Sequence, residues 1–173
     1  AFDDLAPDDV VLFIDGDCLM QRSLTDEETS RLLSYPHGVF GANFNAGPDD
    51  TLAAEASRLG FTTSIAHLEQ SFGPSNRTCF NTGVMAGRTS SWASLADAFV
   101  NAWPRLLEHI PRPNTQWLMS WLLQHPPFSV DVLPLSFHTH GHFGLFPGVE
   151  VRGGRVYVDR TLAAFSHNIT WKP

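Results

Sequence analysis

Cysteine, long apolar runs and basic residues are all scarce in this chain of 173 residues. The two cysteines, Cys18 and Cys79, are too few for a disulfide-stapled scaffold and lack the paired spacing of a zinc ribbon. They are therefore either two free thiols or a single bridge. No apolar stretch approaches the roughly 20 residues that span a bilayer, and the acidic start AFDDLAPDD is not a signal peptide. We expect no membrane contact from this segment.

Charge also limits the choice of partner. Lys and Arg number 11 against 18 Asp and Glu, which gives a net charge of −7. A basic face that would bind nucleic acid is excluded by this balance, and an anionic ligand would need a metal ion or local dipoles. The hydrophobic content of 43% is typical of a globular protein. With no internal repeat or linker, residues 1–173 are expected to form a single domain.

Segments typical of strands and helices alternate along the chain, which predicts a mixed α/β fold. The run Val10–Ile14 is β-branched and aromatic and is expected to be a strand buried on both faces. Thr25 and Glu28 form a capping box ahead of a short helix. Further strands are expected at Val39–Ala42, Phe61–Ile65, Cys79–Ala86, Val130–Leu133, Val149–Val151 and Val156–Val158. Further helices are expected from Pro48-Asp49-Asp50 to about Leu59, over Ser91–Trp103 and over Thr115–His125.

Two carboxylates follow the first strand. Asp15 and Asp17 are separated only by Gly16, which relaxes the backbone limits at this point. Carboxylates at positions i and i+2 of a strand exit can turn toward one hard divalent cation, and ligands of open α/β sheets bind at the carboxyl ends of strands. The alternative is a solvated acidic turn.

Two polar segments interrupt otherwise apolar elements. Asn81-Thr82-Gly83 lies inside a strand that is expected to be buried, where glycine indicates either a bulge or the close approach of a ligand or another backbone. Asn114-Thr115-Gln116 begins a helix, where Asn114 or Thr115 can cap and free N–H groups can receive an anion or a sugar hydroxyl.

Histidines lie late in the chain. His138, His140 and His142 alternate with other residues, so a strand would place them on one face, where they could bind a transition metal. An exposed loop is the alternative. His167 is a candidate metal ligand and Lys172 a candidate phosphate partner, although a lone histidine near a terminus is usually neither.

In this order, the segments resemble nucleotide-sugar glycosyltransferases of the GT-A fold. Asp15-Gly16-Asp17 resembles the D-x-D metal motif of that fold, Phe80–Met85 its [YF]-[LF]-N-[ST]-G segment, and His167-Asn168 with Lys172-Pro173 its late H-x-x-G-x-x-K-P element. The resemblance implies a mixed sheet flanked by helices, a UDP-sugar donor, and a protein or glycan acceptor. It assigns Mn²⁺, or Mg²⁺, to Asp15, Asp17 and His167. Catalytic contacts are assigned to Asn81 and Gln116, and donor or acceptor binding to Gly16, Asn43, Thr82, Gly83, Asn114, Thr115 and Lys172.

A closer resemblance is to the glycosyltransferase domain of procollagen-lysine hydroxylase/glycosyltransferases. Phe40-Gly41-Ala42-Asn43 is similar to the F-[GS]-A-E stretch of that family, and Asn114-Thr115-Gln116 stands where it has D-D-Q. The likeness implies a retaining reaction and, with the sequons at Asn76 and Asn168, the secretory pathway (endoplasmic reticulum or Golgi lumen) if the parent protein is eukaryotic. Only fourteen residues precede Asp15, so we expect this chain to be the C-terminal portion of a larger GT-A domain.

Two rival interpretations remain. The opening also resembles haloacid-dehalogenase-type phosphohydrolases, with Asp15 as nucleophile, Asp17 as general acid, and Gly47–Asp50 as an acidic later motif. The order of motifs disagrees with that family, because about thirty residues leave no room for its intervening threonine and lysine motifs. The other rival is a non-catalytic GT-A remnant that binds carbohydrate or protein, for which the missing D-D-Q carboxylates are the main support.

Overall fold

The computed structural model of the chain describes residues 4–45, 49–61, 64–74, 76–109, 114–140 and 147–167. Its helices are α1 (Asp26–Leu33), α2 (Leu52–Arg58), α3 (Ile65–Phe72), α4 (Thr89–Leu107) and α5 (Thr115–Leu122). The first five strands are β1 (Val10–Ile14), β2 (Cys18–Met20), β3 (Val39–Phe44), β4 (Phe80–Arg88) and β5 (Ser129–Val132). The others are β6 (His138–His140), β7 (Val149–Arg152), β8 (Arg155–Val158), β9 (Thr161–Leu162) and β10 (Phe165–His167).

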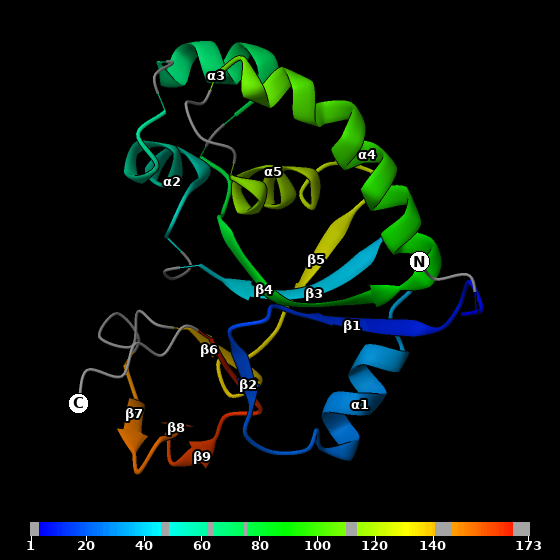
Figure 1. The fold of residues 1–173 in the computed structure, drawn as a ribbon, viewed down its shortest axis with the longest axis vertical. Coiled ribbons are helices and arrows are strands. Elements are labelled where there is room, and N and C mark those ends of the chain that lie inside the picture. The colour runs from blue at the N-terminus through cyan, green and yellow to red at the C-terminus, as the bar shows by residue number, and fades with distance from the viewer. Residues whose placement is uncertain are drawn as a thin grey trace.

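A four-stranded mixed sheet in the order β1-β4-β3-β5 lies at the centre of the molecule (Figure 1). β4 runs antiparallel to both β1 and β3, whereas β5 runs parallel to β3. Helices α2 to α5 lie over one face of this sheet. The other face carries α1 and two three-stranded sheets, β2-β10-β6 and β7-β8-β9 (Figure 1). The mixed α/β fold that the sequence predicts is confirmed.

β4 separates two hydrophobic cores. Its side chains reach both faces of the sheet, and the simple alternation of a strand is interrupted where the register with β3 shifts between the Gly41–Ala86 and Asn43–Asn81 pairs. Phe80 and Met85 pack into the larger core beneath α2 to α5, and Val84 and Ala86 pack into the smaller core beside α1. All four side chains are buried, so β4 has hydrophobic layers on both sides.

The prediction that Val10–Ile14 would be buried on both faces is wrong. β1 is an edge strand that, among the described residues, pairs with β4 alone. Its Phe13 and Ile14 side chains are 44% and 40% exposed. A continuous apolar run indicates a strand, but the run itself does not say whether the strand lies at the centre or at the edge of a sheet.

Local capping signals explain most of the helix starts. Thr25 and Glu28 form the expected capping box of α1. The expected strand at Phe61–Ile65 is wrong, because Ile65 begins α3 and the Ser64 hydroxyl accepts a hydrogen bond from the His67 N–H. The buried side chains of α3, Leu68 and Phe72, lie four residues apart on one helical face. No helix in the described part of the chain is both long and apolar enough to cross a membrane.

Asp131 of β5 joins the central sheet to α1. Its carboxylate accepts two hydrogen bonds of 2.6 Å from Arg31 and one of 2.7 Å from the Tyr35 hydroxyl. The bonds from Arg31 lower the pKa of Asp131 below its usual value of 3.8, and the Tyr35 hydroxyl contributes in the same direction. The folded state therefore binds a proton at Asp131 less readily than the unfolded chain does.

Asp131→Asn is expected to lower the free energy of unfolding by up to about 1 kcal/mol at neutral pH, since the ion pair is partly exposed to solvent. A lowered pKa gives stability that is fully present above the unfolded value of 3.8 and is lost as the pH falls through the folded pKa. Urea denaturation of wild type and variant should thus give a difference that is constant above about pH 5 and shrinks in acid. Asp97→Asn, at an exposed position of α4, is the control and should change the free energy of unfolding at neutral pH by less than about 0.5 kcal/mol.

Candidate active site

The Asp15-Gly16-Asp17 turn connects the central sheet to the small sheet β2-β10-β6. The Asp15 N–H donates to the Gly83 carbonyl at 2.8 Å, and the Cys18 N–H donates back to the Asp15 carbonyl at 3.0 Å. The chain then enters β2, where Cys18 lies opposite His167 of β10. Strand pairing thus brings the two carboxylates and the late histidine together, although about 150 residues separate them in the sequence.

His167 lies directly beside both carboxylates. Its Nε2 is 3.0 Å from Asp17 Oδ1 and 4.0 Å from Asp15 Oδ2. The histidine is 13% exposed, whereas the Asp15 and Asp17 side chains are 41% and 59% exposed, so the site opens to solvent on the carboxylate side. One potential ligand atom from each residue lies within 4.8 Å of the others.

The electrostatics of this group favour a bound cation. Partial burial raises the pKa of Asp15, the charge of Asp17 raises it further, and His167 opposes the rise. Two carboxylates and one imidazole are a donor set that suits divalent cations such as Mn²⁺. The three residues therefore fit the metal that the GT-A resemblance implies.

Asn81 determines which nitrogen of His167 faces the carboxylates. Asn81 Oδ1 accepts a hydrogen bond of 2.9 Å from the Gly83 N–H, which identifies this atom as the oxygen of the amide. The same oxygen lies 3.2 Å from His167 Nδ1. Because an amide oxygen only accepts, Nδ1 carries a hydrogen, and Nε2 is the nitrogen that faces Asp17. A lone pair and a carboxylate oxygen at 3.0 Å repel each other unless a proton or a metal ion lies between them.

The glycine inside β4 makes room for the His167 ring. A Cβ at Gly83 would lie 2.3 Å from His167 Nδ1 and 2.4 Å from its Cε1. The sequence predicts either a bulge or a close approach at this glycine. The structure shows both, because the register of β3 with β4 shifts between the Gly41–Ala86 and Asn43–Asn81 pairs, and the group that approaches Gly83 is an imidazole.

Two of the predicted binding residues have structural roles in the described part of the chain. The Asn43 amide donates to the His138 carbonyl at 2.6 Å and accepts from the Phe44 N–H at 2.7 Å. Asn114 caps α5 by accepting a hydrogen bond of 2.9 Å from the Trp117 N–H. Capping by Asn114 was one of the two expected roles. Lys172 lies outside the described residues.

A cavity of about 410 Å³ connects Asp15 with two other predicted binding residues. Asp15, Thr82 and Thr115 supply its polar groups, and the rest of its wall is mainly apolar. The apolar lining comes from Phe13, Met85, Trp92, Leu95, Ala96, Phe99, Val100 and Met119. A largely apolar cavity with a few convergent polar groups is the usual form of a small-molecule site.

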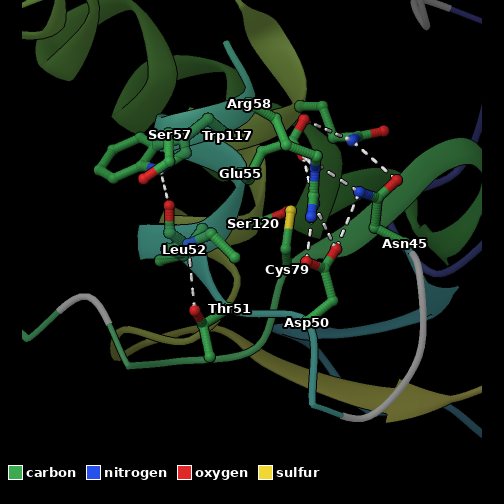
Figure 2. A network of polar contacts seen from close by, with 12 residues as sticks. Asn45, Asp50, Thr51, Leu52, Glu55, Ser57, Arg58, Cys79, Trp117 and Ser120 are labelled. Carbon is green, nitrogen blue, oxygen red and sulfur yellow. Dashed lines mark hydrogen bonds and ion pairs between the residues drawn. The ribbon is translucent and has the colours of Figure 1, made fainter. Parts of the chain in front are cut away.

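Gln116 belongs to a polar network that the sequence did not reveal. Its side-chain nitrogen donates to Asn45 Oδ1 at 3.0 Å and to Glu55 Oε1 at 3.5 Å. Asn45 in turn donates to Asp50 Oδ2 at 3.0 Å and to Glu55 Oε2 at 3.3 Å (Figure 2). The network joins the end of β3, helix α2 and the first turn of α5.

Arg58 provides the positive charge of this network. One of its terminal nitrogens lies 2.7 Å from both oxygens of Asp50, and its Nε donates to Glu55 Oε2 at 2.9 Å (Figure 2). Asp50, Glu55 and Cys79 could form a metal-binding group by distance alone. The guanidinium already holds both carboxylates, however, so we do not assign a metal here.

The sequence contained only weak signals for these contacts. Asp50 was expected to open a helix, but the helix begins at Leu52 with Thr51 as its cap, and Asp50 turns inward. Glu55 and Arg58 have the i, i+3 spacing of a helical ion pair. This spacing would have suggested a pair but not its burial.

Cys18 and Cys79 are both free, so the possible bridge between them does not form. They belong to different groups, Cys18 with His138 and His167, and Cys79 with Asp50 and Glu55. Burial, together with the charges of Asp17 and Asp15, raises the pKa of Cys18 to about 12. At neutral pH the thiol is protonated, which makes it a poor nucleophile.

The central sheet and the position of Asp15 and Asp17 together identify the class of fold. A mixed sheet flanked by helices, with carboxylates at the end of a strand, is the architecture of GT-A glycosyltransferases, which confirms the predicted fold class. Two solved structures of the galactosyltransferase LgtC are similar to 94% of this chain. One is a complex with donor and acceptor sugar analogues, with a TM-score of 0.52 at 19% identity. The other is an active-site glutamine-to-glutamate mutant, with a TM-score of 0.55 at 18% identity.

The likeness to LgtC covers only part of that protein. The chain spans 53% and 54% of those two proteins, or about half of their length. No protein-family model and no curated protein sequence matches this chain. The structures show a glycosyltransferase-like fold, but they do not show the closer relation to procollagen-lysine glycosyltransferases, which stays a prediction.

Gly83→Ala is expected to destabilise the fold by about 1–3 kcal/mol, since the new methyl group must displace either the His167 ring or the β4 backbone. Urea denaturation would measure the change. Gly16→Ala is the matched control, because a Cβ there meets nothing within 4 Å. Equal stability of the two variants would show that the ring does not rest against Gly83.

Arg58→Met is expected to lower the free energy of unfolding by about 2 kcal/mol, because it leaves two buried carboxylates without their cation. The effect should fall below the usual range for buried pairs, since Arg58 is itself 48% exposed. Arg152→Met is the control, because its partner Glu150 is exposed and the pair should contribute less than about 0.5 kcal/mol. A loss no larger than in the control would mean that the network is solvated.

Proposed function

We propose that this chain is the metal-binding portion of a GT-A glycosyltransferase, which transfers a sugar from a UDP-sugar to a protein or glycan acceptor. The observation that carries the proposal is the convergence of Asp15, Asp17 and His167 at a strand end of this fold. The retaining outcome and the secretory location that the sequence resemblance implies are part of the same proposal.

Asp15, Asp17 and His167 would hold Mn²⁺ or Mg²⁺. When bound, such an ion acts as a Lewis acid that offsets the charge of the UDP diphosphate as the sugar–phosphate bond breaks. Asn81 orients His167 for this purpose by accepting the hydrogen of Nδ1. In this proposal, Asn81 acts on the ligand and not on the sugar itself. Lys172 would then be a further partner of the phosphate.

Gln116 presents a defined group to the donor sugar. Both hydrogens of its amide are directed at Asn45 and Glu55, which leaves the carbonyl oxygen as the atom available to a substrate. Asp50 and Glu55 carry two negative charges against the single positive charge of Arg58. This excess of negative charge behind Gln116 would stabilise the positive charge that develops on a sugar as its bond to phosphate breaks.

The cavity next to Asp15 would accept part of the donor or acceptor. Thr82 and Thr115 supply hydroxyl groups, and Trp92 and Phe99 supply flat apolar surfaces. Sugars present hydroxyls at their edges and C–H groups on their faces, which matches such a lining. Gly16 leaves the backbone accessible near the carboxylates, whereas the His167 ring fills the space over Gly83.

The structure gives less support to the phosphohydrolase interpretation. Asp50, from the acidic segment on which that interpretation rested, pairs with Arg58 in a separate buried network. It does not join Asp15 and Asp17 in a possible metal group. The non-catalytic interpretation keeps one argument, since Asn114 is occupied as a helix cap where the related family has a carboxylate.

Asp17→Ala in the complete protein is expected to reduce manganese-dependent hydrolysis or transfer of a UDP-sugar at least 100-fold, because it removes a ligand of the ion that stabilises the leaving UDP. The variant should stay folded, since the Asp17 side chain is exposed. Product formation by chromatography, with circular dichroism as a check of folding, would measure both effects. The control is Asp8→Ala, at an exposed position before β1.

Unchanged activity of Asp17→Ala would refute the role of the carboxylate. An inactive wild type that nevertheless binds Mn²⁺ in calorimetry would support the non-catalytic remnant. Phosphate release with an aspartyl-phosphate trapped on Asp15 would support the phosphohydrolase.

A further inference from the structure

A thiol and two imidazoles meet on the small sheet β2-β10-β6, next to the proposed manganese site. Cys18 Sγ and one ring nitrogen from each of His138 and His167 lie within 4.8 Å of one another. Each residue comes from a different strand of this sheet. Sequence analysis left His138 either in an exposed loop or on a strand, and the structure shows that it lies on β6 and is buried.

Strand register explains why these three side chains share one face. His167 lies opposite Cys18 in the antiparallel pair of β10 and β2. β10 runs parallel to β6, where His138 lies opposite Phe165, two residues before His167. Residues two apart on a strand point to the same side, and the His138 and His167 rings stack with centroids 5.8 Å apart.

The chemistry of this group differs from that of the carboxylate site. Mn²⁺ and Mg²⁺ prefer oxygen ligands, whereas a cysteine thiolate and imidazoles select softer ions such as Zn²⁺. Three protein ligands with a fourth position open to water or substrate are a recurring arrangement of zinc in proteins. Within the described part of the chain, this is the candidate metal group that has one thiol and two imidazoles.

We propose that Cys18, His138 and His167 bind Zn²⁺, and that zinc at this site excludes the metal ion held by Asp15, Asp17 and His167. Binding converts the Cys18 thiol to a thiolate, and its proton passes to the solvent buffer. The exclusion follows from the shared histidine. Asn81 occupies His167 Nδ1, so a single lone pair on Nε2 remains for either ion. This second part rests on the proposed function, whereas zinc binding itself does not.

The other cysteine provides a matched comparison. Cys79 is also near two potential ligands, Asp50 and Glu55. Arg58 already neutralises both of them, and the Cys79 thiol lies 3.9 Å from the Ser120 hydroxyl inside the core. We therefore expect Cys18, and not Cys79, to bind a metal ion.

Co²⁺ tests the zinc site directly, because it occupies zinc sites and has visible absorption. Adding Co²⁺ to this chain should produce a thiolate-to-cobalt charge-transfer band and the intense visible bands of a tetrahedral site. Equimolar Zn²⁺ should abolish both. Cys18→Ser should lose the charge-transfer band, whereas Cys79→Ser should keep it. The absence of this band in wild type, or its survival in Cys18→Ser, would overturn the proposal.

The same experiment includes a check that the variants fold. Cys18 is only partly buried, so its serine variant should give the wild-type circular dichroism spectrum. Should Cys18→Ser misfold, Cys18→Ala would replace it. His138→Gln is a second test of the ligand set, since it removes one imidazole and keeps the thiol. It should weaken Co²⁺ binding at least tenfold. Undiminished binding in His138→Gln would contradict the assigned ligand set.

The exclusion is measured separately, with free Mn²⁺ detected by electron paramagnetic resonance. Zn²⁺ should release bound Mn²⁺ from wild type, and at least tenfold more Zn²⁺ should be needed in the Cys18→Ser variant. Bound Mn²⁺ that persists when zinc occupies its site would refute the exclusion. Failure to bind Mn²⁺ at all, with the cobalt bands intact, would count against the proposed function and leave the zinc site standing.

Discussion

The position of the His167 ring against the backbone of β4 is the constraint on which the site depends. Only a glycine at position 83 admits the ring, and the Asn81 amide, two residues earlier on the same strand, orients it. This contact joins the small sheet β2-β10-β6 to the central sheet. It also brings His167 within reach of two carboxylates that begin their turn at the end of β1. One close contact thus connects the geometry of the fold with the chemistry of the site.

The buried network of Asp50, Glu55 and Arg58 is held together by charge pairing and not by a close packing contact. Asp50 and Glu55 are buried, and their charges are offset by Arg58, which reaches in from a half-exposed position on α2. The Asn45 amide links this pair to Gln116, because its nitrogen donates to Asp50 and its oxygen accepts from Gln116 (Figure 2). The carboxylate–histidine group is open to solvent on its carboxylate side, whereas the carboxylates of the Arg58 network are buried and paired with a guanidinium. The two groups are therefore suited to different tasks, the proposed binding of an ion and the orientation of a side chain.

What the sequence could predict was mainly local. The capping box at Thr25 and the cap at Asn114 depend on residues within one helical turn, and both are confirmed. The order of motifs predicted the GT-A fold. The pairing of β1 at an edge depends on distant strands, however, so its exposure could not be read from an apolar run. The strand expected at Phe61–Ile65 failed because Ser64 begins a helix there.

The site shows the same division between local and distant contacts. Asp15 and Asp17 could be recognised as a pair because one glycine separates them, and the resemblance added His167. The contacts of Cys18 with His138, and of Gln116 with Glu55, join residues that are 61 to 120 positions apart in the sequence. No spacing rule connects such residues, since their proximity follows from strand register. That residues 1–173 form one domain stays a prediction.

The exposed edge of β1 has a consequence for the shape of the site. An open strand edge offers unpaired N–H and C=O groups on which another strand can align. A strand added there would extend the central sheet and run past Asp15, and it would cover Phe13 in the cavity wall. The side of the proposed metal site that faces solvent would then lie beside the added strand. Any strand that pairs with β1 at this edge would therefore also shape the cavity next to Asp15.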